Sequence, residues 1–348
     1  MSSVESESIR EQGDLIIEGR DLNVTFDMDR GKSRVLDDVD LYVKREEILG
    51  IVGESGSGKS MLASSLLDAV VEPGILDGDI TFYPDDGNDP INILEMDTED
   101  LKRFRWETIS MVFQGAMSSF NPTMKIGEHF RETLEAHAYD MPSGMDRAHE
   151  LIAELYMDPD RVLDSYPHEL SGGMKQRALI ALSLVLEPDV LVMDEPTAAL
   201  DLLMQRSILA LIENLQERYN LTIIFITHDL PLVANLADRL SVMYAFKLVE
   251  IGPTDEILEN SAHPYTRALL KATPNLNVPI DEMMPIAGSS PDPVNVPMGC
   301  SYHPRCPLAD EKCQEEPPQL EAIADNHEVS CYHWESIDEA IRLEIDRS

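Results

Sequence analysis

Short apolar runs and segments with helical periodicity alternate along most of the chain. Residues 15–26 and 35–43 partly alternate apolar and polar side chains, which predicts half-buried strands. Residues 48–52, 190–193 and 221–226 are short, unbroken apolar runs of the kind found in buried strands. A helical pattern separates the last two runs, so we expect them to pair in parallel. The pattern therefore predicts an α/β core.

The middle of the chain is mainly helical in pattern, from about residue 125 to residue 168. Four apolar residues of this stretch would share one face of a helix: Ala148, Leu151, Ile152 and Leu155. Pro167 would end the helical run. We therefore expect a helical subdomain, over about residues 115–170, inserted in the α/β core.

The composition changes after about residue 259, because half of the 22 prolines and all four cysteines lie beyond it. We expect residues 1–14 to form a disordered tail, residues 15–259 an α/β domain, and residues 260–348 a separate, loop-rich extension. No stretch reaches the roughly 18 unbroken apolar residues that a membrane span needs, and the polar start of the chain does not resemble a signal peptide.

The formal net charge of -38 comes from 65 acidic and 27 basic residues. Such an excess of carboxylates repels nucleic acid and anionic lipid, so direct nucleic-acid binding is not expected. Lys is scarce, and acidic residues cluster locally, as in residues 95–100. This surface is typical of a protein that works in molar salt, where the Debye length falls to about 3 Å, and it predicts a halophilic source. A generally acidic surface in ordinary salt is the alternative.

Residues 53–60 read Gly-Glu-Ser-Gly-Ser-Gly-Lys-Ser, which satisfies the phosphate-loop pattern between a strand and a helical segment at residues 61–71. The glycines let backbone amides approach phosphates, Lys59 can reach the β- and γ-phosphates, and Ser60 can offer a hydroxyl to Mg²⁺. The expected nucleotide-binding residues here are Gly53, Ser55, Gly56, Gly58, Lys59 and Ser60. ATP and Mg²⁺ are therefore the predicted cofactors.

Asp194 and Glu195 follow an apolar strand, where one carboxylate can hold the water shell of a metal ion and the next can orient an attacking water. His228 follows another strand, and Gln114 follows a third apolar stretch. A histidine at a strand end is more often structural when it is considered alone. Phe26, at the end of the first strand, would by itself suit a hydrophobic core.

Residues 170–177 read Leu-Ser-Gly-Gly-Met-Lys-Gln-Arg, between the phosphate loop and the Asp194-Glu195 pair. This combination resembles the ATP-binding cassette (ABC) ATPases over about residues 15–255. The resemblance implies a RecA-like core, an antiparallel β subdomain and a helical subdomain. It also implies that two cassettes close head to tail over two ATP molecules, as a homodimer or a heterodimer.

The same resemblance assigns roles to individual residues. It implies that Glu195 acts as general base or positions water, that His228 reaches the γ-phosphate, and that Gln114 contacts Mg²⁺ and reports the nucleotide state to a membrane partner. Phe26 would stack on adenine. The residues expected to face the opposing cassette or its nucleotide are Ser171, Gly172, Gly173 and Asp201.

Further segments resemble the ATPases of oligopeptide/dipeptide importers: Phe113-Gln114, Asn121-Pro122, His263-Pro264-Tyr265-Thr266 and residues 297–307. The resemblance implies peripheral attachment at the cytoplasmic face of the cell membrane, with two permease subunits and an extracellular solute-binding protein. Import of di- or oligopeptides is the favoured function. Nickel or sugar import by the same motor is an alternative, and a non-transport ABC ATPase is a weaker one.

Cys300, Cys306, Cys313 and Cys331 follow a C-x5-C-x6-C-x17-C spacing. Four thiolates suit either a 4Fe-4S cluster or a tetrahedral zinc ion, and the C-x2-C pairs usual for zinc are missing. Four free thiols are a third alternative. The resemblance to the dipeptide type favours iron–sulfur. Three nearby histidines keep a mixed zinc site open: His303, His327 and His333. One departure from relatives is Phe246, where Gly often follows Ala.

Overall fold

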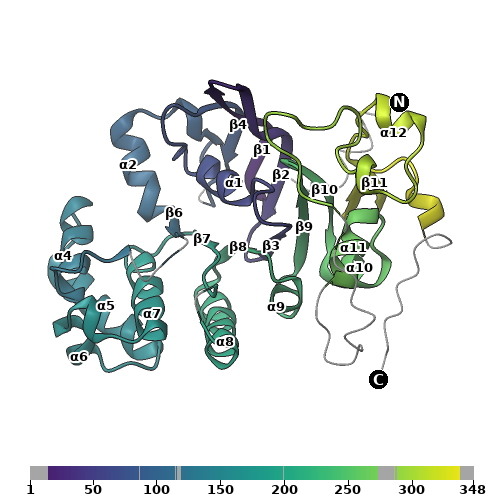
Figure 1. Cartoon of the computed structure of the whole chain (residues 1–348). Coiled ribbons are helices and arrows are strands. Elements are labelled where there is room, and N and C mark those ends of the chain that lie inside the picture. Colours follow the sequence, from purple (N-terminus) through teal and green to yellow (C-terminus); the bar gives the residue numbers. More distant parts are fainter. Residues whose placement is uncertain are drawn as a thin grey trace. The chain divides into compact units, whose positions relative to one another are not determined.

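The structure is a computed structural model that describes residues 15–85, 87–113, 115, 119–198, 200–272, 286 and 288–337. The predicted tail and Gln114 lie outside the described residues. The chain divides into two compact units. The first unit comprises Met1–Glu95 and Thr227–Ser348, and the second comprises Met96–Ile226. Figure 1 shows the elements in chain order.

An antiparallel sheet in the order β2-β1-β4-β5 forms the N-terminal part of the first unit. Its strands are β1 Leu15–Met28, β2 Gly31–Lys44, β4 Ile75–Phe82 and β5 Ile91–Asn92. The two predicted strands are confirmed and are longer than expected. The pattern did not predict β4, because its exposed and half-buried residues include two aspartates and a glycine. This sheet is the expected antiparallel β subdomain.

The first unit also holds strands β3 Ile48–Val52, β9 Arg239–Tyr244, β10 Lys247–Pro253, β12 His327–Val329 and β11 Glu321–Ala324. β3 pairs with β9 in parallel, and the pairs β9–β10, β10–β12 and β12–β11 are antiparallel. The extension was expected to be separate. Instead, its strand β12 continues the sheet from β10, since main-chain hydrogen bonds between strands are indifferent to sequence separation.

The turn between β9 and β10 carries the departure at Phe246. Ala245 and Phe246 have positive φ values of 47° and 73°. Two consecutive positive φ values are typical of a type I′ hairpin turn, in which glycine is favoured. The Phe246 amide donates to the carbonyl of Ser57 in the phosphate loop at 3.0 Å, and the Phe246 carbonyl accepts from the amide of Asp37 at 3.0 Å. The turn therefore braces the phosphate loop.

Among the described residues, the first unit also contains the α-helices α1 Lys59–Leu66, α9 Leu230–Ala234, α10 Thr254–Asn260, α11 Pro264–Ala272 and α12 Glu311–Glu315. The helix predicted over residues 61–71 begins at Lys59 and ends earlier, at Leu66. The chain then turns, with Asp68 in the left-handed region at φ 46°. The described residues 84, 85 and 87–90 form a loop, as predicted.

The second unit contains a parallel sheet in the order β8-β7-β6. Its strands are β6 Ile109–Val112, β7 Val190–Asp194 and β8 Thr222–Thr227. Helix α8 Leu202–Tyr219 connects β7 to β8, which confirms the predicted crossover and parallel pairing. All residues of the three strands are buried, as their apolar runs indicated.

Helices α4 Ile126–Ala136, α5 Met141–Glu154, α6 Pro159–Asp164 and α7 Gly172–Ser183 form one group in the second unit (Figure 1). The predicted apolar face of α5 is buried. The expectation that Pro167 ends the helical run was wrong, because α6 already ends at Asp164 and Pro167 begins a short 3₁₀ turn, Pro167–Glu169. The helical subdomain is thus present, although its exact bounds stay a prediction.

Part of the acidic cluster at residues 95–100 has a structural role. Helix α2 spans Thr98–Glu107, and the Asp97 carboxylate accepts from the amides of Glu99 and Asp100, each at 2.9 Å. Such N-caps stabilise a helix by about 1 kcal/mol.

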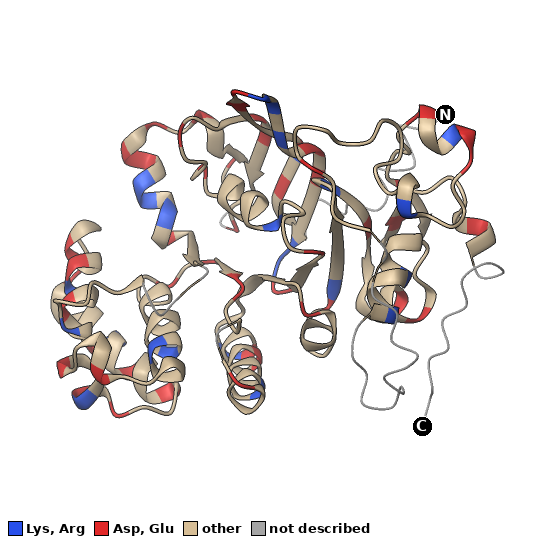
Figure 2. Cartoon of the chain, in the orientation of Figure 1, with Lys and Arg blue, Asp and Glu red and all other residues tan. Residues whose placement is uncertain are grey.

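Figure 2 shows acidic residues on helices, strands and loops of both units, and basic residues in fewer places. Among the described residues, no helix is long and apolar enough to cross a membrane.

Candidate nucleotide site and cysteine site

The phosphate loop connects β3 to α1 with a backbone that requires glycine. Gly53, Gly56 and Gly58 have φ values of 155°, 80° and 108°. A Cβ atom on Gly53 would lie 2.2 Å from the carbonyl oxygen of Met243, whereas one on Gly56 would meet nothing within 4 Å. The loop is therefore packed on one side and open at Gly56, the side on which a ligand could approach.

The polar groups of this loop fit a phosphate ligand. The Lys59 ammonium is buried and donates to the carbonyls of Gly53 and Glu54 at 2.8 and 3.0 Å. The hydroxyl of Ser57 is buried without a hydrogen-bond partner among the described residues. Ser60 is exposed on the first turn of α1, where a hydroxyl could reach Mg²⁺, and Ser55 is exposed within the loop. Side-chain donors that suit an anion are thus present in the loop.

Phe26 is half-buried near the end of β1 and lines an open groove of ≈ 640 Å³. Asp27, Arg30 and Pro73 are among the other lining residues, and a Cβ atom on Gly74 would lie 2.7 Å from the Phe26 ring. The ring is therefore not a core side chain. This position suits stacking on a flat base, which stays a prediction.

Glu54, the second residue of the phosphate loop, is held by three residues that the sequence did not single out for this role. Both Arg305 nitrogens donate to its carboxylate, Nη1 to Oε2 at 2.8 Å and Nη2 to Oε1 at 3.0 Å. The Ser290 hydroxyl donates to the same carboxylate at 3.1 Å, and the Glu54 amide donates to the Tyr265 hydroxyl at 2.8 Å. Burial opposes ionisation of Glu54, but these bonds and the Arg305 charge hold the pKa of the carboxyl below its ordinary value.

The His263-Pro264-Tyr265 segment, noted in the sequence only for its resemblance, anchors helix α11 and the Tyr265 ring. The Glu250 carboxylate is fully buried and accepts from the amide of His263 at 3.1 Å and also from the amide of Ala262. The His263 Nδ1 accepts from the Tyr265 amide at 3.0 Å. Burial lowers the pKa of His263 to about 3, so its imidazole is neutral. The segment thus places Tyr265 beside the phosphate loop.

His228 belongs to the first unit. It lies between β8 and α9, and its side chain is exposed. Asp229, the next residue, caps α9 by accepting from the amide of Leu232 at 3.2 Å. The imidazole is exposed, and its contact with a γ-phosphate stays a prediction.

Asp194 and Glu195 lie in the second unit at the carboxyl end of β7. Asp194 is the last residue of the strand and is buried. Glu195 adopts a left-handed backbone at φ 49°, and its amide donates to the carbonyl of Ile226 in β8 at 2.9 Å. A non-glycine residue in this region is strained and is typical of functional positions. The strained turn carries the Glu195 side chain off the end of the strand.

The Ser-Gly-Gly segment lies in the second unit, at the N-terminus of α7, as predicted. The Ser171 hydroxyl accepts from the amide of Met174 at 3.3 Å and so caps the helix. Gly172 opens α7, and a Cβ atom on Gly173 would lie 1.9 Å from the methyl group of Met204. The cap and the glycines leave the helix N-terminus with its favourable dipole for an anion.

Asp201 is the N-cap of α8, and its carboxylate accepts from the amides of Leu203 and Met204 at 3.1 and 3.0 Å. The predicted contact with an opposing cassette is untested. Exposed apolar side chains follow directly, since Leu202 and Leu203 are 67% and 78% exposed. The N-terminus of α8 therefore combines a polar cap, Asp201, with two exposed apolar side chains, Leu202 and Leu203.

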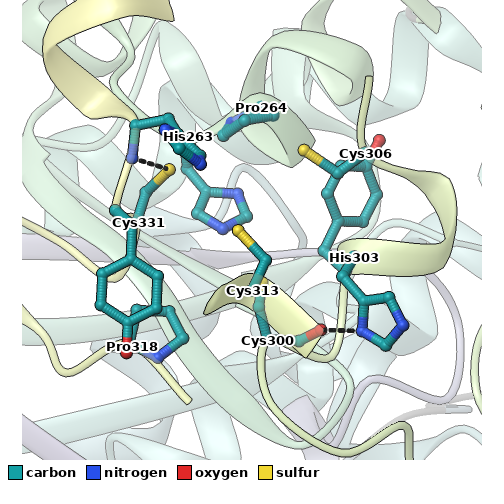
Figure 3. A pocket seen from close by; sticks show the side chains of 11 residues that line it. His263, Pro264, Cys300, His303, Cys306, Cys313, Pro318 and Cys331 are labelled. Carbon is teal, nitrogen blue, oxygen red and sulfur yellow. Dashed lines mark hydrogen bonds between the residues drawn. The ribbon is translucent and has the colours of Figure 1, made fainter. Parts of the chain in front are cut away.

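The four cysteines, all within residues 300–331, line one cavity of the first unit (Figure 3). None forms a disulfide. Burial raises the pKa of each thiol, to about 11 for Cys306 and about 12 for Cys331, so without a bound cation the four are neutral. The predicted convergence of the four cysteines is present, and a soft metal centre fits this donor set.

The spacing of the sulfurs bears on which metal centre fits. A tetrahedral zinc ion with Zn–S bonds of about 2.3 Å would bring sulfurs within about 3.8 Å of one another. Among the described residues, however, the only group of three donors whose atoms all lie within 4.8 Å is Asp310, Cys313 and His333. No three of the four sulfurs therefore lie as close together as the ligands of one zinc ion would.

The three histidines kept for a mixed zinc site are placed differently. His333 belongs to the compact group that it forms with Asp310 and Cys313, and its Nε2 lies 3.1 Å from the Asp310 carboxylate. His303 lines the cavity, and its Nδ1 is at 2.9 Å from the Cys300 carbonyl. His327 is buried with Nε2 at 2.9 Å from Glu250 and does not line the cavity, so its inclusion was wrong. Packing of β12 on β10 commits it to that carboxylate.

Two family models match the chain. The ABC transporter model matches residues 36–198, and the model of the oligopeptide/dipeptide transporter C-terminal region matches residues 249–313. A bacterial ABC transporter cassette solved as a dimer superposes with a TM-score of 0.59 and 26% identity, over 69% of this chain and 99% of that one. The fold and the phosphate loop thus define an ATPase of the ABC class.

Two relatives narrow this class. The dipeptide transport ATP-binding protein DppD of Caldanaerobacter subterraneus subsp. tengcongensis is 39% identical over 92% of this chain and 98% of its own length. The oligopeptide transport ATP-binding protein OppD of Escherichia coli is 37% identical over 95% and 98%. The chain belongs to the family of ATP-binding subunits of oligopeptide/dipeptide ABC transporters.

Proposed function

We propose that this ATPase energises the uptake of di- or oligopeptides across the cytoplasmic membrane, at whose inner face it binds as a peripheral subunit. The observation that carries the proposal is the joint match of the cassette and of the oligopeptide/dipeptide C-terminal region within one chain. The relatives named for dipeptide and oligopeptide transport extend over nearly the whole sequence. Similarity in both the cassette and the C-terminal region supports the proposal that this chain, like those relatives, serves peptide transport.

The proposal assigns the following roles in ATP hydrolysis. The phosphate loop Gly53–Ser60 binds the phosphates of ATP, Phe26 stacks on adenine, and Ser60, Gln114 and Asp194 serve the Mg²⁺ shell. Glu195 orients the attacking water and accepts its proton, while His228 contacts the γ-phosphate. Phosphoryl transfer depends mainly on positioning and charge neutralisation, which suits this set of residues.

A second cassette completes each ATP site in this proposal. Ser171, Gly172 and Gly173 at the N-terminus of α7 face the γ-phosphate held by the partner, and Asp201 contacts that partner. The solved cassette of similar fold is a dimer. The chain carries both halves of a composite site, and we propose a heterodimer that works with two permease subunits and an extracellular solute-binding protein.

Peptide-stimulated ATP hydrolysis tests this function. The chain would be purified with its co-expressed permeases and binding protein, reconstituted in vesicles, and assayed with dipeptides, longer peptides, Ni²⁺ and sugars. We expect peptides to stimulate hydrolysis and uptake. Stimulation by Ni²⁺ or a sugar alone would transfer the assignment to those solutes, and hydrolysis that no solute or permease affects would favour a non-transport ABC ATPase.

Glu195→Gln is the matched variant for that assay. The amide keeps the shape of the side chain but cannot accept the proton of water, so turnover should fall by about 10²- to 10⁴-fold while ATP binding is retained. Rates of phosphate release and the affinity for ATP are measured separately. Hydrolysis at the wild-type rate would remove Glu195 from the reaction.

We further propose that Cys300, Cys306, Cys313 and Cys331 hold a 4Fe-4S cluster. The shared cavity and the spacing of the sulfurs beyond that of a tetrahedral zinc site support this choice. Protein purified without oxygen should be brown and contain about four irons per chain, and Cys306→Ser should lose both iron and colour. Stoichiometric zinc, retained in Asp310→Ala, would favour a four-cysteine zinc site, and zinc lost in that variant would favour the compact group at Cys313.

The acidic composition supports a last proposal, that the chain works in molar salt. Self-repulsion of a surface with net charge -38 is relieved when salt screens it. The melting temperature should therefore rise from 0.1 M to 2 M KCl. A melting temperature that is already maximal at 0.1 M would indicate an ordinary acidic surface.

A further inference from the structure

The phosphate loop carries a negative charge of its own. Glu54 is its second residue, and its side chain is 23% exposed. ATP brings several negative charges to the same loop, so an uncompensated carboxylate here would oppose its binding. The loop therefore needs a cation at this point besides Lys59.

Arg305 supplies that cation from the other end of the chain, 251 residues away in sequence. Its side chain is only 7% exposed, and its two terminal nitrogens meet the two Glu54 oxygens as a fork. This two-pronged geometry fixes direction as well as charge, which a lysine cannot reproduce. The guanidinium thus neutralises and orients the carboxylate together.

An aromatic wall holds Arg305 in place. Nη1 also donates to the Tyr244 hydroxyl at 3.2 Å, and the guanidinium carbon lies 5.6 and 5.8 Å from the ring centres of Tyr244 and Tyr302. Tyr265, whose hydroxyl accepts from the Glu54 amide, packs on both rings. The same cluster of Arg305 and three tyrosines therefore holds both the carboxylate and the backbone amide of Glu54.

Arg305 also belongs to the cysteine segment, residues 300–331, which carries the four cysteines. It ends a short 3₁₀ turn, His303–Arg305, and Cys306 follows directly. The amide of Cys300 donates to the carbonyl of Cys313 at 2.8 Å. The amide of Arg305 donates to the carbonyl of Tyr302 at 2.9 Å. The residues that converge on the cysteine cavity thus set the position of the Arg305 backbone.

We propose that Arg305 is a positioning residue for ATP binding: by pairing with Glu54 it cancels the charge of the phosphate loop and fixes its shape, and it thereby joins the cysteine segment to the nucleotide site. The inference rests on the proposed use of Gly53–Ser60 as the ATP phosphate site. It assigns to the C-terminal extension a direct part in nucleotide affinity.

A double-mutant comparison of ATP affinity tests the proposal. Arg305→Met leaves the Glu54 charge uncompensated, so the Kd for ATP should rise about tenfold, whereas Glu54→Gln should change it by less than about threefold. In the double variant the Kd should return to that of Glu54→Gln, because no carboxylate remains to be neutralised. The KM for ATP should follow the Kd, with kcat at saturation nearly unchanged, and the Arg305→Met defect should shrink in 2 M KCl.

Two further variants keep the test decisive. Lys44→Met removes another contact of the extension, the 3.0 Å bond from Lys44 Nζ to Asn326 Oδ1, without touching the phosphate loop, and should bind ATP as wild type does. Arg305→Lys keeps the charge but loses the fork, so its Kd should lie between wild type and Arg305→Met; it replaces Arg305→Met if the latter does not fold.

Two results would overturn the proposal. In the first, Arg305→Met and Arg305→Lys bind ATP as wild type does. In the second, the double variant binds as weakly as Arg305→Met, which would mean that Arg305 only holds the extension in place. A wild-type protein that does not bind ATP, or that binds it equally well as Lys59→Ala, would instead contradict the proposed phosphate site itself.

Discussion

The phosphate loop and the cysteine cavity, both in the first unit, are two different ways to receive a charged group. The loop is built from contiguous backbone, with glycines at positive φ and a buried Lys59 already bonded to loop carbonyls. The cavity is built from four side chains whose thiols burial keeps neutral. In our proposal, the loop is organised before its ligand arrives, whereas the cysteine site depends on a cation to become charged.

This difference predicts that the two sites respond separately to mutation, except through Arg305. The largest expected effect is that of Lys59→Ala on ATP. Removal of the buried ammonium that we propose to bind the phosphates should weaken ATP binding by about 100-fold, while the metal content of the cysteine site stays at the wild-type level. Equilibrium binding of labelled ATP and metal analysis of the same preparation measure both. Loss of metal in this variant would show that the sites are not separable.

Cys306→Ser is the reciprocal experiment. It should remove the bound metal, lower the melting temperature by several degrees because ligand binding to the native state is lost, and weaken ATP binding by less than about tenfold. Metal content, calorimetry and the Kd for ATP are compared with those of Ser336→Ala, an exposed serine of the same extension. An unchanged melting temperature would contradict a structural contribution from the cysteine site.

Phe26→Ala tests whether the preorganised site extends from the phosphates to the base. Loss of one stacking surface, worth roughly 1–3 kcal/mol, should raise the KM for ATP by about tenfold or more with little change in kcat. Phe26→Tyr retains the aromatic face and should behave as wild type. Equal KM values for the alanine and tyrosine variants would remove Phe26 from the nucleotide site.

The effect on ATP binding is expected to be smallest at His263, whose role concerns pH and stability; it lies in the wall of the cysteine cavity and bonds to Tyr265 beside the phosphate loop. Its pKa is lowered to about 3 in the folded protein from an ordinary 6.5, so the unfolded chain binds more protons between these values. The stabilisation is complete above about pH 6.5 and is lost as the pH falls toward 3. The free energy of unfolding should drop by about 1.4 kcal/mol per pH unit in that window.

His263→Asn is the matched variant, because its amide oxygen can accept from the Tyr265 amide but does not titrate. Urea unfolding at pH 7.5, 6.5 and 5.5 should show a shallower decline for this variant than for wild type. Parallel declines would assign the acid sensitivity to other groups.

Much of the fold was predictable because it depends on local pattern. The buried strands β3, β7 and β8 are unbroken apolar runs, and the apolar face of α5 has helical spacing. Strands β9 and β10 escaped prediction because buried polar residues interrupt them, among them Arg239, which is paired with Glu47 at 2.9 Å. A pattern of apolar residues cannot show that a distant carboxylate will compensate a buried charge.

The sequence by itself determined the phosphate loop, the Ser-Gly-Gly helix start and the strand that ends at Asp194-Glu195, since each is a contiguous segment whose residue types dictate a local backbone. Only the tertiary structure decided that β12 extends the sheet at β10 and that Arg305 meets Glu54. These are contacts between residues far apart in the chain. They leave no periodic trace in the sequence, because side-chain charge and backbone hydrogen bonds act over distance in space and not along the chain.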